Sequence, residues 1–328
     1  MSLKEKNRIV IPVECPVQSL CWEGEELVDW AGGGIRFALT GETKKSNIRF
    51  GDQFDRAVVS LDRRFAVLYE VLGTKGLVVC GREHTREINR CDYYARTYEY
   101  PIAIFSLPDG TQALAHCPDA YNKIEIEELS SGRRLTERIG KGVDFFHSRL
   151  QVSPGGTYLV SAGWVWQPID AVQIFLVADV LKSPEQLDQY DDFGLCGLPS
   201  PVEITHATFQ SDDVLLLAGH NGEGVPPKIY LVGYSLGDKK VLFSTPMEEI
   251  PGTIMPLGTE HVVGFYGHPK LFENCSGKVV HEWPGLKSGQ QDSSIIRNEN
   301  EIPPLALDPA HKRFAIADEK QITVIQLA

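Results

Sequence analysis

The sequence predicts an all-β fold built from seven similar units, and three observations support this prediction. Helical periodicity is scarce along the 328 residues, whereas segments rich in β-branched and aromatic residues alternate with Gly, Pro, Asp and Ser. The steps between successive copies of a repeated phrase lie between 38 and 57 residues, near the 328/7, or about 47, expected for seven equal units. This strand–turn–strand phrase recurs at 58–70, 105–117, 150–163, 208–220, 255–268 and 305–318, with a weaker copy at 19–33.

The copy at 105–117 shows what one unit contains. An apolar strand leads to the turn Pro108-Asp109-Gly110, a second strand runs to Cys117, and a third strand follows at 123–129. Strands joined by tight turns form an antiparallel meander, and the step length is that of a four-stranded propeller blade. The sequence therefore predicts a seven-bladed β-propeller of four-stranded antiparallel blades, as a single domain over residues 1–328. The blades are expected to start near residues 17, 55, 101, 147, 204, 252 and 302.

The last unit lacks its outer strand. After the copy at 305–318, the strand at 322–327 is followed by one more residue. Near the N-terminus, Ile9, Ile11 and Val13 alternate with other residues as they would in a strand. We therefore expect an N-terminal strand to complete the seventh blade and close the ring, which removes an exposed sheet edge. The alternative is that residues 1–12 form a frayed tail.

Two turn phrases resemble those of a known family. Ser106-Leu107-Pro108-Asp109-Gly110 and Val152-Ser153-Pro154-Gly155-Gly156 are similar to the turn between the first two strands in WD-repeat and related bacterial seven-bladed propellers. The resemblance covers nearly the whole chain and implies the same ring of blades. The chain departs from the strict pattern because no unit carries the Trp-Asp dipeptide. Its Gly-His pairs, Gly219-His220 and Gly267-His268, end second strands instead.

Composition restricts the classes of function. There are 32 Lys and Arg against 44 Asp and Glu, a net charge of −12, with 42% hydrophobic and 23% charged residues. Distributed acid repels phosphate backbones, so we expect no nucleic-acid partner unless a basic patch forms locally. No apolar run approaches the ~18 residues of a membrane span, and no secretory h-region follows the first residues. Seven cysteines without a C-x-x-C pair are typical of reduced thiols, so we expect a cytoplasmic protein without a membrane partner.

Two stretches depart from the regular repeat. The insertion 182–203 is expected to contain one short helix, with Ser183 as its N-cap, Pro184 at its first position and Gly194 as its stop. It could be functional, or it could be a tolerated surface loop. The stretch 83–100 mixes four tyrosines with arginines and is consistent with an aromatic outer strand or a binding loop.

Candidate binding residues gather where second strands end and where the chain leads into the next blade. In a propeller these connections share one face around the central channel, which ligands and partners commonly use. We expect the two tryptophans to point to opposite sides of their strand, with one packed inward and the other exposed as an interaction hot spot. The candidates are His116, Trp164, Trp166, His220 and His268, together with His147 and His206 in the segments that lead into blades four and five.

Two functions from different classes fit these residues. The favoured hypothesis is a non-catalytic scaffold that binds a protein or peptide on this face, because the common catalytic and phosphate-binding motifs are absent from the sequence. The alternative is a propeller enzyme, a hydrolase or lyase, that uses a histidine-rich site on the face for metal or acid–base chemistry. The first hypothesis predicts no cofactor, no metal and a monomer. A subunit of a larger assembly is a third alternative.

Overall fold

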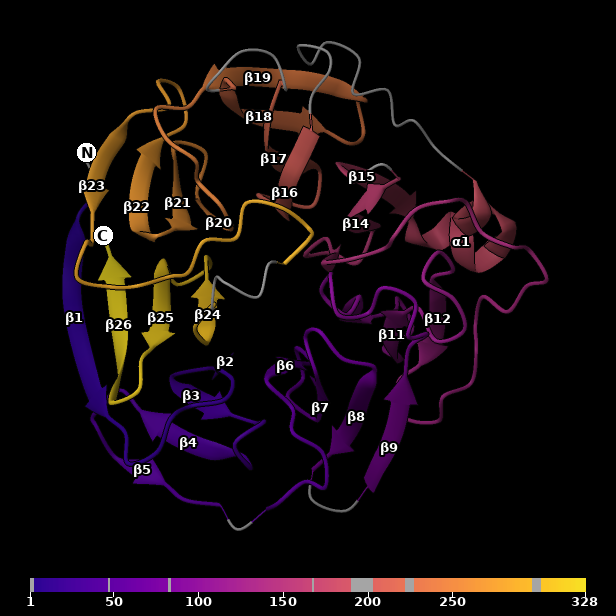
Figure 1. The fold of residues 1–328 in the computed structure, drawn as a ribbon, viewed down its shortest axis with the longest axis horizontal. Coiled ribbons are helices and arrows are strands. Elements are labelled where there is room, and N and C mark those ends of the chain that lie inside the picture. The colour runs from indigo at the N-terminus through magenta and orange to yellow at the C-terminus, as the bar shows by residue number, and fades with distance from the viewer. Residues whose placement is uncertain are drawn as a thin grey trace.

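The computed structural model shows seven β-sheets arranged in a ring, as seen along the ring axis in Figure 1. Each sheet is antiparallel, and its strands follow one another outward from the centre in chain order, apart from the blade that closes the ring. The described residues are 3–46, 48–81, 84–166, 168–189, 203–221, 227–296 and 302–328.

The first four blades form from consecutive stretches of the chain. Blade one comprises β2 (Cys21–Glu23), β3 (Glu26–Asp29), β4 (Ile35–Ala38) and β5 (Thr43–Lys44). Blade two comprises β6 (Arg56–Val59), β7 (Phe65–Tyr69), β8 (Lys75–Cys80) and β9 (His84–Asn89). Blade three comprises β10 (Ile102–Ser106), β11 (Gln112–His116) and β12 (Glu125–Glu128). Blade four comprises β13 (Leu150–Val152), β14 (Tyr158–Val165) and β15 (Ile169–Leu176).

The remaining three blades each have four strands. Blade five comprises β16 (Glu203–Phe209), β17 (Val214–His220), β18 (Ile229–Ser235) and β19 (Lys240–Pro246). Blade six comprises β20 (Ile254–Leu257), β21 (His261–Tyr266), β22 (His268–Glu273) and β23 (Val279–Glu282). Blade seven comprises β24 (Leu305–Asp308), β25 (Arg313–Ala317), β26 (Gln321–Leu327) and β1 (Glu5–Pro12). The predicted seven-bladed all-β propeller is confirmed.

Blades three and four fill their outer positions differently from the others. In blade three, Arg134 forms an isolated bridge with Glu127, and the Leu135 amide donates a hydrogen bond to the Ile126 carbonyl at 2.8 Å. In blade four, β15 is followed by helix α1 (Val177–Lys182) and the 3₁₀-helix η1 (Pro184–Asp188). These short pieces therefore stand beside the third strands where a regular fourth strand runs in the other blades.

The insertion is partly as predicted. A helical turn begins at Pro184 as expected, but it is a 3₁₀-helix that ends at Asp188, and Ser183 makes no side-chain capping bond. The α-helix before it was not predicted. It forms because Val177 and Val180 are buried in the cluster that joins blades three and four, so packing decides its conformation. The predicted stop at Gly194 lies outside the described residues.

The N-terminal strand closes the ring. Strand β1 pairs antiparallel with β26, with Arg8 opposite Ile325 and Pro12 opposite Gln321. The Ile11 side chain is fully buried in the cluster between blades seven and one, and Ile9 packs against the same cluster. The expectation of closure is confirmed, and the alternative of a frayed tail is wrong for the described part of this segment.

We expect Ile11→Ala to lower the free energy of unfolding by about 2–3 kcal/mol, because it opens a cavity in the closing blade. The neighbouring Val10 faces the other side of β1 and is half-exposed, so Val10→Ala is expected to cost less than about 1 kcal/mol. Urea unfolding of both variants measures the two values. Equal losses of unfolding free energy in the two variants would show that the closed ring does not depend on the burial of Ile11.

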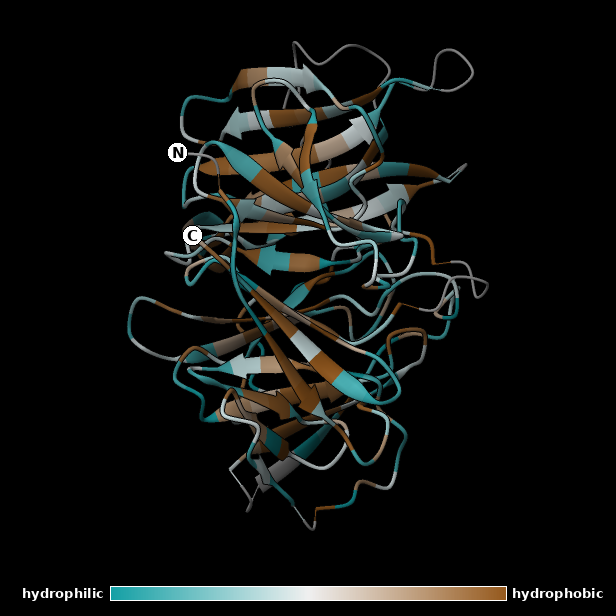
Figure 2. Cartoon of the chain, turned by 90° about the vertical axis from the view of Figure 1, so that its left-hand side faces the viewer, coloured by the Kyte–Doolittle hydropathy of each residue, from teal (hydrophilic) through white to brown (hydrophobic). Residues whose placement is uncertain are grey.

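The apolar core lies between neighbouring blades. The second strands β7 and β25 are buried along their whole length, because both faces of these strands pack against other sheets. Figure 2 shows hydrophobic colouring along the strands and hydrophilic colouring on many of the connecting loops. Rigid sheets whose connecting loops gather on one face are a usual scaffold for a binding site.

Candidate functional site

A tyrosine-rich loop follows β9 on the face where second strands end, here called the loop face. The buried Arg90 organises it: its Nη2 donates hydrogen bonds to the carbonyls of Ala95, at 2.6 Å, and Tyr98, at 3.1 Å. Its guanidinium also stacks over the rings of Tyr98 and Tyr100, each 4.8 Å from the ring centroid. Of the two sequence alternatives for this stretch, residues 84–89 form the outer strand and most of the tyrosines lie in the loop.

Aromatic side chains from blades two, three and four meet above this loop. The rings of Phe146 and Trp164 stack at 3.7 Å with an interplanar angle of 9°, and Tyr98 contacts both edge-on. Tyr121 stacks on the other side of Phe146 at 4.2 Å. Aromatic pairs of this kind add stabilisation beyond that of their buried area. The stacked and edge-on contacts therefore hold these rings in fixed positions, and the cluster forms a rigid base.

Exposed rings lie on top of this base. Tyr93 is 50% exposed, Tyr94 43% and Trp166 59%. Tyr94 lies 4.8 Å from Tyr93 and 5.9 Å from Trp166, measured between ring centroids, so the three form one continuous surface. Tyr121, half-buried, borders Tyr93 at 5.1 Å. We call Tyr93, Tyr94, Tyr121 and Trp166 the aromatic patch.

A glycine allows the stack to form. The backbones of Phe146 and Trp164 exchange hydrogen bonds of 2.8 and 3.2 Å, which places the chain leading into blade four directly against β14. A Cβ atom on Gly163 would lie only 1.9 Å from the Phe146 carbonyl oxygen. Any other residue at 163 would push Phe146 away from the Trp164 ring, so glycine is required by the close approach of the two backbones.

The two tryptophans confirm one expectation and correct another. Trp164 is 2% exposed and Trp166 is the exposed one, so one indole packs inward and the other faces solvent. They do not point to opposite sides, because residues two apart on a strand share a face. Their ring centroids lie 5.9 Å apart, and Trp164 supports Trp166 from below.

Three of the candidate histidines are buried. His116 places its Nε2 atom 3.4 Å from a carboxylate oxygen of Glu127. The Nδ1 atom of His147 lies 3.0 Å from the Ser161 hydroxyl, and His206 is buried at the start of blade five. Burial lowers the pKa of both His147 and His206 to about 3, so these two imidazoles are neutral at pH 7. None of the three presents its ring to solvent, because His116 at the end of β11, His147 before β13 and His206 on β16 are all buried in the packing.

The other two histidines are half-buried and have separate surroundings. His268 places Nε2 3.0 Å from a carboxylate oxygen of Glu282 on the outer strand of blade six. His220 lines a cavity beside the connection between blades six and seven. The structure thus joins Trp164 and Trp166 but distributes the imidazoles over several blades. Across the described ranges, no three His, Cys, Asp or Glu side chains are grouped as ligands for a metal ion.

The connection between blades six and seven crosses the loop face, as Figure 1 shows. Gly289 pairs with Gly267 at its start, and Ile295 pairs with Tyr98 near its described end. Between them, the Ser294 amide donates a hydrogen bond of 2.8 Å to the buried Asp170 carboxylate, which also accepts one from the Ser294 hydroxyl. We call residues 284–296 the crossing segment.

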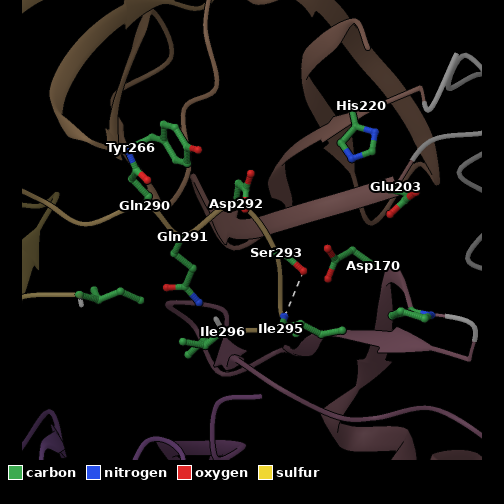
Figure 3. A pocket seen from close by; sticks show the side chains of 12 residues that line it. Asp170, Glu203, His220, Tyr266, Gln290, Gln291, Asp292, Ser293, Ile295 and Ile296 are labelled. Carbon is green, nitrogen blue, oxygen red and sulfur yellow. Dashed lines mark hydrogen bonds between the residues drawn. The ribbon is translucent and has the colours of Figure 1, made fainter. Parts of the chain in front are cut away.

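A cavity of about 420 Å³ lies beside the crossing segment. Figure 3 shows acidic, amide and imidazole side chains around it. No Lys or Arg is among its described lining residues, so the cavity is acidic. Ile295 lines the cavity and also packs against the stack of Tyr98, Phe146 and Trp164, so cavity and aromatic patch are adjacent. The lining includes Asp170, Glu203, His220, Tyr266, Gln291 and Asp292.

Sequence reasoning missed the crossing segment and the acidic cavity. One signal was available: the stretch between Glu282 and Leu305 is long and polar and has no strand pattern. Its contact partners, Asp170 in blade four and Tyr98 before blade three, are distant in the sequence. Such pairings depend on the closed ring and have no local signature.

Fold and site define a seven-bladed β-propeller with an aromatic and acidic loop face. No protein-family model and no curated protein matches the chain. Among solved structures, hydrazine synthase from Kuenenia stuttgartiensis is similar over 96% of this chain and 97% of that chain, with a TM-score of 0.60 and 12% identity. A streptogramin B lyase aligns over 100% and 98%, with a TM-score of 0.57 and 10% identity. A catalytically inactive virginiamycin B lyase from Staphylococcus aureus with quinupristin aligns over 98% of this chain and 100% of that chain, with a TM-score of 0.56 and 12% identity. At these identities the likeness shows the fold alone.

Proposed function

We propose that this propeller is a non-catalytic binding protein that takes a segment of a partner protein on the aromatic patch. The observation that supports the proposal is the continuous exposed surface of Tyr93, Tyr94 and Trp166 on a rigid buried stack. Trp and Tyr are enriched among the residues that dominate binding energy, since they bring large apolar area at low entropic cost. A patch already held in place loses little further freedom when a partner binds.

Charge favours a basic partner segment. The chain carries a net charge of −12, and the cavity beside the patch is lined by Asp170, Glu203 and Asp292. A segment with a large apolar side chain for the patch and a Lys or Arg for the cavity would complement both. Opposite charge also accelerates encounter between partners.

The proposal includes a monomer that acts in the cytoplasm without a nucleic-acid or membrane partner. All six cysteines in the described ranges are free, which supports a reducing compartment. In the part of the chain that the structure describes, no helix has both the length and the apolar character needed to span a bilayer.

Trp166→Ala is expected to weaken partner binding by about 30-fold or more, the effect of removing a hot-spot residue. Proteins retained from an extract of the native cell by the immobilised wild type, but not by this variant, identify the partner. Titration calorimetry with the purified partner then measures the affinity. Leu61→Ala is the matched control, because Leu61 is also exposed but lies in the β6–β7 turn on the opposite face. If the same proteins bind all three columns with unchanged affinity, the patch is not the binding surface.

A further inference from the structure

A basic groove lies between blades one and two, away from the aromatic patch. Its volume is about 330 Å³, and no acidic side chain is among its described lining residues. This is unusual in a chain with a net charge of −12. The groove is lined by Arg36, Lys44, Lys45, Arg63 and Arg64, together with Trp30, Gly34, Ser46, Ile48 and Gly81. We call it the basic groove.

One wall of the basic groove is held rigidly. The buried Glu23 carboxylate accepts a hydrogen bond of 2.8 Å from Trp30 Nε1 and one of 2.7 Å from Arg36 Nη2. This shared carboxylate locks both the indole and the guanidinium in place. Lys44, on the outer strand β5, forms an ion pair of 3.2 Å with Glu26 on β3. The aromatic and cationic parts of this wall are therefore already in position before any ligand arrives.

The opposite wall carries two arginines without acidic partners. Within the described residues, the Arg63 and Arg64 guanidinium groups form no hydrogen bond and no ion pair, although Arg64 also lies over the Phe65 ring. Arg36 and the lysines are balanced by glutamates, so these two arginines leave the groove with an excess of positive charge. Guanidinium groups bind phosphate through two parallel hydrogen bonds and are more weakly hydrated than an ammonium group.

Arg63 also occupies a left-handed backbone position that is glycine in blades three and four and lysine in blade seven. Its φ is +58°, and its amide donates to the carbonyl three residues earlier in the β6–β7 turn. In the corresponding turns of blades three and four, Gly110 and Gly156 make the same bond with φ of +86° and +76°. A left-handed conformation is free for glycine but costs other residues on the order of 1 kcal/mol.

We propose that the basic groove is a binding site for a small phosphomonoester. The unpaired Arg63 and Arg64 would bind the phosphate group, and the fixed Trp30 ring would contact the organic part. A phosphomonoester carries about 1.5–2 negative charges at pH 7, which matches the excess charge of the groove. This site is independent of the proposed partner-binding function, because none of its lining residues belongs to the aromatic patch.

The test uses AMP, inorganic phosphate and adenosine in titration calorimetry at fixed low salt in phosphate-free buffer. We expect AMP and inorganic phosphate each to bind at one site per protein molecule, and we expect adenosine not to bind. Arg63→Gly is expected to weaken AMP binding about tenfold or more, since it removes one charge-assisted contact. It should not lower the melting temperature, because glycine adopts the left-handed backbone without strain.

Lys312→Gly is the matched control. Lys312 lies in the equivalent turn of blade seven with φ of +50° and the same backbone bond, and it too is a cation. Its variant relieves the same strain and removes the same charge, and AMP affinity should stay unchanged. The proposal is overturned if neither phosphate nor AMP binds at millimolar concentration, if phosphate binds without AMP, or if both variants lose affinity equally. Binding of a single-stranded oligonucleotide in place of AMP would also overturn it, in favour of a polyanion.

Discussion

Lowering the pH from 7 to 5 is expected to reduce the free energy of unfolding by about 4 kcal/mol through His147 and His206 alone. Both imidazoles are buried, and burial lowers each pKa from 6.5 to about 3. In the unfolded chain each histidine takes up a proton as the pH falls through 6.5, whereas in the folded protein each stays neutral until about pH 3. The unfolded state therefore binds more protons across this window, and stability falls with pH at about 1.4 kcal/mol per histidine and pH unit.

Urea unfolding at pH 7 and pH 5 measures this loss for the wild type and for His206→Leu. Leucine is neutral at both values, so the variant should lose about 2 kcal/mol less than the wild type between them. The comparison removes contributions of other groups, such as Glu99, whose pKa is raised by burial and which acts in the opposite direction. A pH dependence that is identical in the two proteins would show that the pKa of His206 is not lowered in the folded state.

Trp164→Ala is expected to lower the free energy of unfolding by about 3–5 kcal/mol, the range for removing a fully buried aromatic side chain. Trp164 is 2% exposed, stacks on Phe146 at 3.7 Å and contacts Tyr98, so its loss leaves a cavity at the centre of the aromatic cluster. The same change should weaken partner binding, because Trp166 and Tyr94 rest on this indole.

Trp166→Ala is the matched control, since it removes the same side chain two residues further along. Trp166 is 59% exposed, so its loss should change stability by less than about 1 kcal/mol. Urea unfolding followed by circular dichroism gives both values independently of tryptophan fluorescence. Similar losses in the two variants would contradict the separation between a buried base and an exposed patch.

The candidate site was predictable only in part. The sequence predicts that one of Trp164 and Trp166 is an exposed hot spot, and the structure shows that it is Trp166. The tyrosines of 83–100 are predicted to lie in a binding loop or an outer strand. That Tyr94 lies beside Trp166 could not be predicted, because it requires the loop after blade two to fold over blade four. The histidines at 116, 147 and 206 share turn-like sequence positions with exposed residues, and local sequence does not show which side of the chain the next blade covers.

By itself the sequence determined the repeat, the seven blades, their turns and the closure by the N-terminal strand. These features follow from local patterns: alternation with a period of two, turn residues at regular steps, and a missing strand at one end matched by a spare strand at the other. Only the tertiary structure decided that β15 would lead into a helix, that the crossing segment would reach Asp170, and that Arg63 would face Trp30 across a groove. Each of these depends on side chains far apart in the chain that meet when the ring closes, and their contacts carry no periodic signal.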